Sequence, residues 1–297
     1  MRFLFVDRIV ELVPGEVIRG IKCITRDDYY LRDDEQGRAY FLPCIMGEAL
    51  GQLAAWNVMF TQAFVKRPVA GIAARALLHR KAYVGETLLL EATIDALDDA
   101  AVQYHGHVRV GDELVFSLEG ALGPLLPMGD FIDEALVRRQ FEEINRPGEW
   151  SRVSSSVVEV MDPIVAQGVG SRVASMMFDA IIKDEPGVRL TAVKFITRAA
   201  PYFADHFPNK PVLPMTVLLE CSLNLAHEFV RRASYEQLFE VRSIRRTKMS
   251  DFIVPGDAVI ASLHVKKQDH ETLILACRVD VMDKRVCVFE IEMVVIT

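Results

Sequence analysis

The sequence carries no excess of positive charge and no long apolar run. Across 297 residues the net charge is −7, and the pI is about 5.6. This balance gives no bulk electrostatic case for binding nucleic acid or an anionic membrane. No stretch approaches the ~20 uninterrupted apolar residues of a membrane span, and Asp7 interrupts the N-terminal segment where a signal peptide would have its apolar core. We therefore expect a cytoplasmic protein with neither nucleic acid nor membrane as a partner.

Cysteine is scarce, and the common cofactor motifs are missing. The five cysteines are odd in number and form no CxxC pair, so reduced, packed thiols are the expected state. We find no phosphate-binding glycine loop, Walker motif or nucleophile elbow, and the histidines do not cluster with acids or thiols. We therefore expect no cofactor and no metal. With 51% apolar and 25% charged residues, the chain has the composition of a globular protein with a full core.

The chain contains an internal repeat. Residues 6–30 superpose on residues 178–202 at a constant offset of 172, and both segments contain a Pro-Gly turn and an Ile-Thr pair. The same offset places Glu48 on Glu220. Because one register holds over so much of the chain, we interpret it as a tandem duplication.

Each copy is predicted to contain the same order of elements. A β-rich entry segment precedes a loop, and a long apolar helix follows over roughly 44–65 or 215–232. Both helices start just after a proline, which suits a first helical turn. Runs of alternating apolar and polar residues then predict antiparallel strands separated by short turns. A long helix wrapped by an antiparallel sheet, occurring twice, is the expected architecture.

We predict three segments along the chain. The first repeat covers 1–123 and the second covers 178–297. Between them, 124–177 is predicted to be a linker. It contains an amphipathic helix within 127–150, and 151–177 is either more linker or an extra strand.

One motif in the second repeat resembles the signature of a known family. It runs ADHFPNKPVLPMTVLLE over 204–220, with a glutamate fourteen residues after His206. This is similar to the His-Phe-Pro…Glu pattern of the β-hydroxyacyl-(acyl carrier protein) dehydratases, the FabA/FabZ-like enzymes of fatty-acid synthesis. The entry segment 4–15 also resembles that family. The resemblance implies an α+β double hot-dog fold, in which two antiparallel sheets each wrap a long central helix to form an internal pseudo-dimer.

The motif departs from the family at one position. The family usually has glycine after the second proline, and the N–H of that residue helps to hold the thioester carbonyl. Here Met215 follows Pro214, and we expect its side chain to restrict the acyl group or to occupy the tunnel. By resemblance, we expect Phe207, Pro214, Met215 and Gln52 to contact the substrate.

The resemblance also implies which residues act together. In these dehydratases the His comes from one hot dog and the carboxylate from its neighbour, so His206 should act as base with Glu48 as acid. The first helix keeps the family's Glu-Ala-Leu-x-Gln pattern from Glu48 to Gln52. The reciprocal pair is Asp34 with Glu220; because Asp34 replaces the histidine, we interpret this pair as a vestigial site. One working site per chain is therefore expected.

The predicted reaction is dehydration of a β-hydroxyacyl thioester carried on acyl carrier protein or coenzyme A. A basic cluster is usually only a solvated strand face, but Arg245, Arg246 and Lys248 are candidates for docking an acidic carrier. A homodimer of pseudo-dimers is compatible with this organisation.

The alternatives to a dehydratase are a hot-dog thioesterase and a non-catalytic acyl-binding or scaffold subunit of a synthase, since Met215 could plug the tunnel. The (R)-specific enoyl hydratases fit less well.

Overall fold

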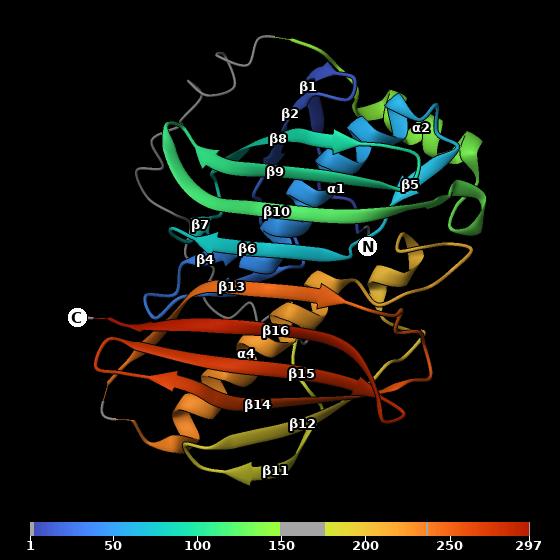
Figure 1. The fold of residues 1–297 in the computed structure, drawn as a ribbon. Helices are drawn as coiled ribbons and strands as arrows, with labels where there is room; N and C mark the ends of the chain where they lie inside the picture. The colour runs from blue at the N-terminus through green and yellow to red at the C-terminus, as the bar shows by residue number, and fades with distance from the viewer. Residues whose placement is uncertain (1–2, 149–175, 236, 297) are drawn as a thin grey trace.

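Two long helices lie against one face of a large antiparallel sheet (Figure 1). The structure is a computed structural model, and it describes residues 3–148, 176–235 and 237–296. The N-terminal half supplies helix α1 and the C-terminal half supplies helix α4, each covered by its own half of the sheet.

In the first half, helix α1 spans Pro43–Thr61 and a shorter helix, α2, spans Glu134–Ile144. A 3-10 turn lies at Met128–Asp130. The main strands are β1 Arg8–Val13, β2 Val17–Cys23, β6 Ile72–Leu78, β8 Thr87–Leu97, β9 Ala101–Val110 and β10 Glu113–Pro127. The short strands are β3 Leu31–Asp33, β4 Ala39–Phe41, β5 Lys66–Pro68 and β7 Ala82–Tyr83.

The second half repeats this order. Helix α4 spans Met215–Ala233, which is α1 moved by 172 residues, and a 3-10 turn precedes it at Pro201–Ala204. The strands are β11 Ala180–Glu185, β12 Arg189–Phe195, β13 Phe239–Met249, β14 Ala258–Gln268, β15 Thr272–Val281 and β16 Lys284–Val295. The repeat predicted from the sequence is therefore present in the fold.

The two half-sheets join edge to edge. Among the described residues, thirteen strands form one sheet with the order β1-β2-β8-β9-β10-β6-β13-β16-β15-β14-β12-β11, and β5 adds to β10. Strands β6 and β13 are adjacent at the centre of Figure 1, and their register pairs Leu77 with Ser243 and Ala76 with Ile244. This arrangement is the predicted double hot dog, with the two sheets continuous across the junction.

The strands follow the alternation in the sequence. In β15, every second residue from Leu273 to Val281 is buried, and the residues between them face outward. This period of two is what a sheet with one face on the core requires. The inward-facing side chains cover α4, and the core is continuous from one half to the other.

Helix α1 ends earlier than predicted. The sequence predicted a helix to residue 65, but α1 stops at Thr61. Ala63 and Phe64 adopt left-handed backbone angles, with φ of 51° and 63°, and the Phe64 N–H closes the end on the carbonyl of Met59 at 2.7 Å. The chain then turns directly into β5, which pairs with β10.

The helix predicted between the repeats is α2. Asp133 caps it by accepting from the Leu136 N–H at 3.1 Å. Its apolar side reaches the end of α1, where the Phe141 ring stacks on Phe60 at 5.2 Å. The alternatives for 151–177 lie almost wholly outside the described residues, and the division of the chain at residues 123 and 178 stays a prediction. In the part of the chain that the structure describes, no helix is long and apolar enough to cross a membrane.

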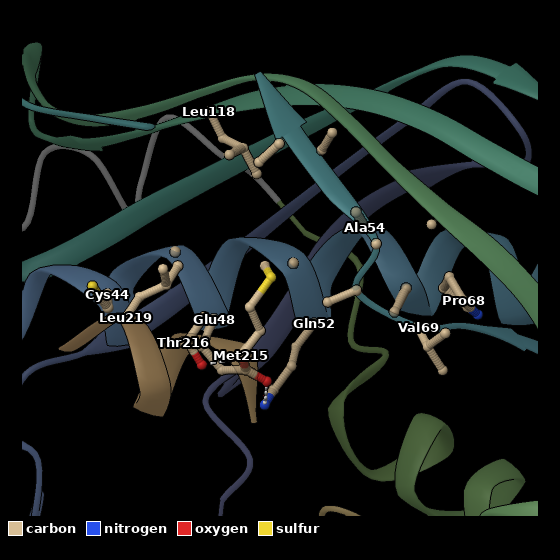
Figure 2. Close-up of a pocket in the computed structure, with 18 of the residues that line it drawn as sticks. Cys44, Glu48, Gln52, Ala54, Pro68, Val69, Leu118, Met215, Thr216 and Leu219 are labelled. Atoms are coloured by element: carbon tan, nitrogen blue, oxygen red, sulfur yellow. Dashed lines mark hydrogen bonds between the residues drawn. The ribbon is translucent and has the colours of Figure 1, made fainter. Parts of the chain in front are cut away.

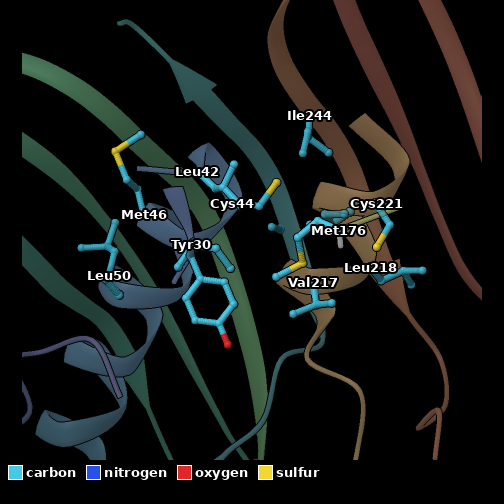
Figure 3. Packing of buried hydrophobic residues seen from close by; sticks show 14 of the residues in the cluster. Tyr30, Leu42, Cys44, Met46, Leu50, Met176, Val217, Leu218, Cys221 and Ile244 are labelled. Carbon is cyan, nitrogen blue, oxygen red and sulfur yellow. The ribbon is translucent and has the colours of Figure 1, made fainter. Parts of the chain in front are cut away.

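The first turns of the two central helices meet in the core. Cys44 and Met46 of α1 and Val217 and Cys221 of α4 are all buried there (Figure 3). Each helix therefore begins at the junction between the repeats, and residues near its start can contact the other repeat.

Candidate active site

The loop after the second 3-10 turn fixes His206. Its backbone N–H donates to the carbonyl of Tyr202 at 2.9 Å, and its carbonyl accepts from the Val212 N–H at 3.2 Å. The imidazole Nδ1 lies 3.0 Å from the carbonyl oxygen of Val212. A carbonyl only accepts, so Nδ1 carries the hydrogen and Nε2 of the neutral ring keeps a free lone pair.

His206 is tuned toward the neutral form. Burial is the largest influence and lowers the pKa of its imidazole below the ordinary value; Glu48 and the Val212 carbonyl raise the pKa, and Arg67 lowers it further. The net effect is a lowered pKa, so the ring is unprotonated at neutral pH and its Nε2 can accept a proton.

Glu48 lies on the second turn of α1 and is held from both repeats (Figure 2). The Gln52 side chain, one turn further on, donates from Nε2 to Oε1 at 2.9 Å. Thr216, the second residue of α4, donates from its hydroxyl to Oε2 at 2.7 Å. Each carboxylate oxygen therefore has one protein partner, and one of those partners comes from the opposite repeat.

The N-terminal segment closes one side of this site. Gln52 accepts from the Phe5 N–H at 2.9 Å and donates to the Phe3 carbonyl at 3.0 Å. The Phe3 N–H donates to the Asp205 carboxylate at 2.6 Å, and the Phe3 ring meets the His206 ring edge-on at 5.8 Å. The segment thus ties the Gln52 side chain to the loop that bears His206.

His206 and Glu48 both face a single cavity of about 220 Å³. Most of its lining is apolar, and it extends along α1 past Trp56 and Met59 to Val137 on α2. Both repeats contribute to it. A narrow apolar cavity that ends in a few polar groups suits a ligand with an acyl chain and a polar head.

The predicted substrate contacts lie around the same cavity. Met215, Phe207 and Gln52 line it directly, whereas Pro214 is buried at the N-cap of α4. No side chain caps α4 among the described residues, and the first turn's N–H groups start at Met215. The Met215 side chain projects beside Glu48 and Gln52 (Figure 2). It forms part of the cavity wall, and whether it restricts the acyl group stays a prediction.

In the reciprocal pair, Asp34 and Glu220 each bind other groups among the described residues. Glu220 is 1% exposed; it accepts from the Cys44 N–H at 3.3 Å and pairs with Arg32 at 3.5 Å. Burial raises the pKa of Glu220, and Arg32 acts against that rise. Cys44 occupies the position in α1 that Thr216 occupies in α4. Glu220 is therefore the structural counterpart of Glu48, with an arginine beside it.

Asp34 is engaged elsewhere. Its carboxylate accepts from the Arg38 guanidinium at 3.0 Å and from the Tyr83 hydroxyl at 3.2 Å. Burial acts to raise its pKa, but hydrogen bonds from Arg38, Gln36 and Tyr83 outweigh burial and hold the pKa of Asp34 below its usual value. The group at the histidine's counterpart position is thus a fixed carboxylate. The vestigial character of this pair stays a prediction.

The candidate docking residues lie on β13 beside the repeat junction. Arg245 pairs with Glu292 at 3.3 Å and Arg246 pairs with Glu290 at 3.1 Å, while Lys248 is exposed. Arg245 faces Arg75 of β6 across the junction. Two of the three cations therefore already have intramolecular partners, and the docking role stays a prediction.

Two residues of the site were not predicted from the sequence. Thr216 contacts Glu48, and Arg67 brings a positive charge into the cavity wall. The repeat register could have suggested Thr216, since Glu48 and Glu220 lie at equivalent places near helix starts. Arg67 gave no signal, because it lies beyond the predicted helix of 44–65 in a segment to which no element was assigned.

The fold is shared with solved structures that include a thioesterase. A tesB protein from Mycobacterium avium subspecies paratuberculosis has a TM-score of 0.58 at 11% identity and covers 98% of this chain and 97% of its own. The 12:0-ACP thioesterase from Umbellularia californica has a TM-score of 0.53 at 13% identity and covers 94% of each chain. At these identities the likeness concerns the fold alone, and the class it defines is that of double hot-dog proteins.

Sequence comparison narrows the class. The family model described as ApeI dehydratase (ApeI-like) matches residues 183–288. The FabZ 3-hydroxyacyl-(acyl carrier protein) dehydratase of Anaeromyxobacter sp. is 32% identical over 121 residues, or 39% of this chain and 74% of the relative. That of Shewanella woodyi is 28% identical over 120 residues, with 39% and 79% covered. This chain belongs to the FabA/FabZ-like dehydratase family.

Proposed function

We propose that the chain dehydrates a β-hydroxyacyl thioester to the trans-2-enoyl thioester at one composite site between its repeats. The observation that carries this proposal is the convergence of His206 from the second repeat and Glu48 from the first on the same cavity. The two groups interact electrostatically, and the Thr216 hydroxyl links the Glu48 carboxyl to the helix that follows the His206 loop.

The reaction needs a base at the α-carbon and an acid at the β-hydroxyl. Nε2 of neutral His206 takes the α-proton, and the carbon electron pair forms the new double bond as the C–O bond breaks. Glu48 gives its proton to the departing hydroxyl, which leaves as water. The imidazolium proton then returns to the Glu48 carboxylate and resets the site.

The thioester carbonyl is assigned to the start of α4. The N–H groups of the first helical turn and the positive end of the helix stabilise an oxygen that gains negative charge as the α-proton leaves. The acyl chain then extends along the apolar cavity beside α1 toward Trp56 and Val137. This placement puts the α- and β-carbons between His206 and Glu48.

The substrate is proposed to arrive on acyl carrier protein. The FabZ relatives are named for carrier-bound substrates, and the exposed Lys248 on β13 is the cation best placed to meet an acidic carrier. Phe3, Leu4 and Met215 line the polar part of the cavity, where the thioester is proposed to lie.

The test is an assay of 3-hydroxybutyryl and 3-hydroxydodecanoyl thioesters on carrier protein and on coenzyme A, with product identification by mass spectrometry. We expect an enoyl thioester and water as products. His206→Ala should lower kcat by at least about 100-fold, the contribution of a positioned general base. The variant's melting temperature controls for folding.

Two results would overturn this proposal. Release of a free thiol without an enoyl product would identify a thioesterase. Stoichiometric binding of the acyl thioester without turnover would identify an acyl-binding subunit.

A further inference from the structure

Arg67 enters the cavity wall from the short strand β5. That strand follows the early end of α1 and pairs with β10, where Arg67 lies opposite Leu126. The guanidinium carbon lies 3.7 Å from the centre of the Phe207 ring, in the position of a cation–π contact. The Phe207 ring in turn stacks on the His206 ring at 4.0 Å. Arg67 is therefore next to the reacting groups.

The guanidinium lacks a hydrogen-bond partner where one is needed. Its Nε is buried and has no partner among the described residues, and the ion pairs found in that part of the chain do not include Arg67. The oxygens of the nearby Glu48 carboxylate are occupied by Gln52 and Thr216. The positive charge has an anion in the same site but donates no direct hydrogen bond to it among the described residues, and an arginine has only donors to offer.

Two other arginines also have a buried Nε without a partner among the described residues, but they lie outside the cavity lining. The Nε atoms of Arg75 and Arg245 are also buried without a partner. These two arginines oppose one another across the β6–β13 junction, and neither lines the cavity. Of these three arginines, Arg67 is the one that lines the cavity.

Arg67 keeps its charge in this setting. Burial lowers its pKa to about 9, and Glu48 acts to raise the pKa. The guanidinium is consequently cationic at neutral pH, in a cavity whose walls are otherwise mainly apolar. A buried cation with unused donors attracts an oxygen that carries negative charge more strongly than a neutral one.

We propose that Arg67 is a ligand-binding residue whose guanidinium donates to a negatively charged oxygen inside the acyl cavity. The effect that we expect of Arg67 on the reaction rate rests on the proposed function. The effect that we expect on ligand binding does not. The oxygen has two chemical sources. It is either the thioester oxygen, which becomes anionic as the α-proton leaves, or a carboxylate carried by the acyl chain itself.

The binding test uses sodium hexanoate and hexan-1-ol as probes, measured by titration calorimetry on the full chain. We expect the wild type to bind hexanoate at least about tenfold more tightly than hexanol, as a charge-assisted hydrogen bond implies. Arg67→Met should reduce this preference to about twofold or less. The matched control is Arg75→Met, which removes an equally unpartnered Nε outside the cavity and should retain the preference.

The kinetic test separates the two sources of charge. If the oxygen is the thioester's, Arg67→Met lowers kcat on 3-hydroxyhexanoyl pantetheine by about 100-fold with little change in KM. If the oxygen belongs to the chain, this substrate is turned over normally, and KM rises only for its analogue with a terminal carboxylate.

Two results overturn the inference, whether or not the chain is a dehydratase. One is a wild type without preference for hexanoate over hexanol. The other is an Arg67→Met variant that prefers hexanoate over hexanol as strongly as the wild type does and has an unchanged melting temperature. Arg67→Lys, which keeps the charge but not the planar fork, should retain part of the preference.

Discussion

The hydroxyl of Thr216 suits a carboxyl group that changes its protonation state during turnover. Gln52 offers Glu48 an N–H that can only donate, so Oε1 is held as an acceptor. A hydroxyl can either donate or accept, so the Thr216 contact to Oε2 persists when Glu48 is ionised and can reverse when Oε2 carries a proton. In the proposed mechanism, the proton that Glu48 delivers to the leaving hydroxyl is therefore assigned to Oε2.

Removal of this hydroxyl should affect the chemical step more than binding. Thr216→Val keeps the shape of the side chain, and we expect kcat to fall about tenfold with KM nearly unchanged. This loss is smaller than the full contribution of a positioned general acid, because Glu48 itself is still present. Thr216→Ser restores the hydroxyl and should recover most of the rate. Steady-state kinetics of the two variants measure this. A Val variant as fast as the wild type would remove Thr216 from the mechanism.

The lowered pKa of His206 predicts the acidic limb of the pH profile. The active form is the neutral imidazole, so kcat/KM should fall only below pH ~6.5, the ordinary value for histidine. Glu48 on α1 and Arg67 on β5 act on this ring with opposite signs. Loss of a positive charge in Arg67→Met should therefore move the limb to higher pH. If kcat/KM of this variant falls at the same pH as in the wild type, Arg67 does not act electrostatically on His206.

At the scale of elements, α2 determines how far the cavity extends. Phe141 anchors α2 on Phe60, and Val137, 2% exposed, forms part of the far wall. Val137→Phe adds bulk there. We expect a higher KM for 3-hydroxydodecanoyl thioesters and little change for 3-hydroxybutyryl thioesters. Equal effects on both would mean that the chain does not run toward α2.

The elements themselves were largely predictable. Period-two alternation placed the strands, and apolar runs after a proline placed the two central helices, because these patterns reflect direct contacts with the core. The end of α1 was predicted wrongly at residue 65, since apolar composition continues to Val65 while Ala63 and Phe64 adopt left-handed angles. The position of α2 against α1 could not be predicted, because an amphipathic pattern does not name the surface that it covers.

At the scale of the molecule, the repeats place both halves of the proposed site in one chain. His206 and Glu48 belong to different repeats that are joined through β6 and β13. A mixture of His206→Ala and Glu48→Gln proteins should therefore stay inactive, since no chain contains both residues. Activity assays on the mixed variants test this. Recovery of a measurable fraction of wild-type activity would instead place the site between chains.

The sequence predicted the proposed site in part. The register of 172 residues related Glu48 to Glu220, and the motif at His206 carried the family resemblance. The partners Arg32 and Arg67 were not predictable, because they reach these groups from strands β3 and β5 only through the packing of the fold.

The central claim is that Glu48, and not Glu220, works with His206. The most direct measurement compares Glu48→Gln with Glu220→Gln in the same dehydration assay, with melting temperatures for both. We expect a loss of kcat of about 100-fold or more for Glu48→Gln. For Glu220→Gln we expect a rate within about threefold of the wild type, because the Glu220 side chain binds Arg32 and the start of α1. Loss of activity in a folded Glu220→Gln, with Glu48→Gln fully active, would contradict this claim.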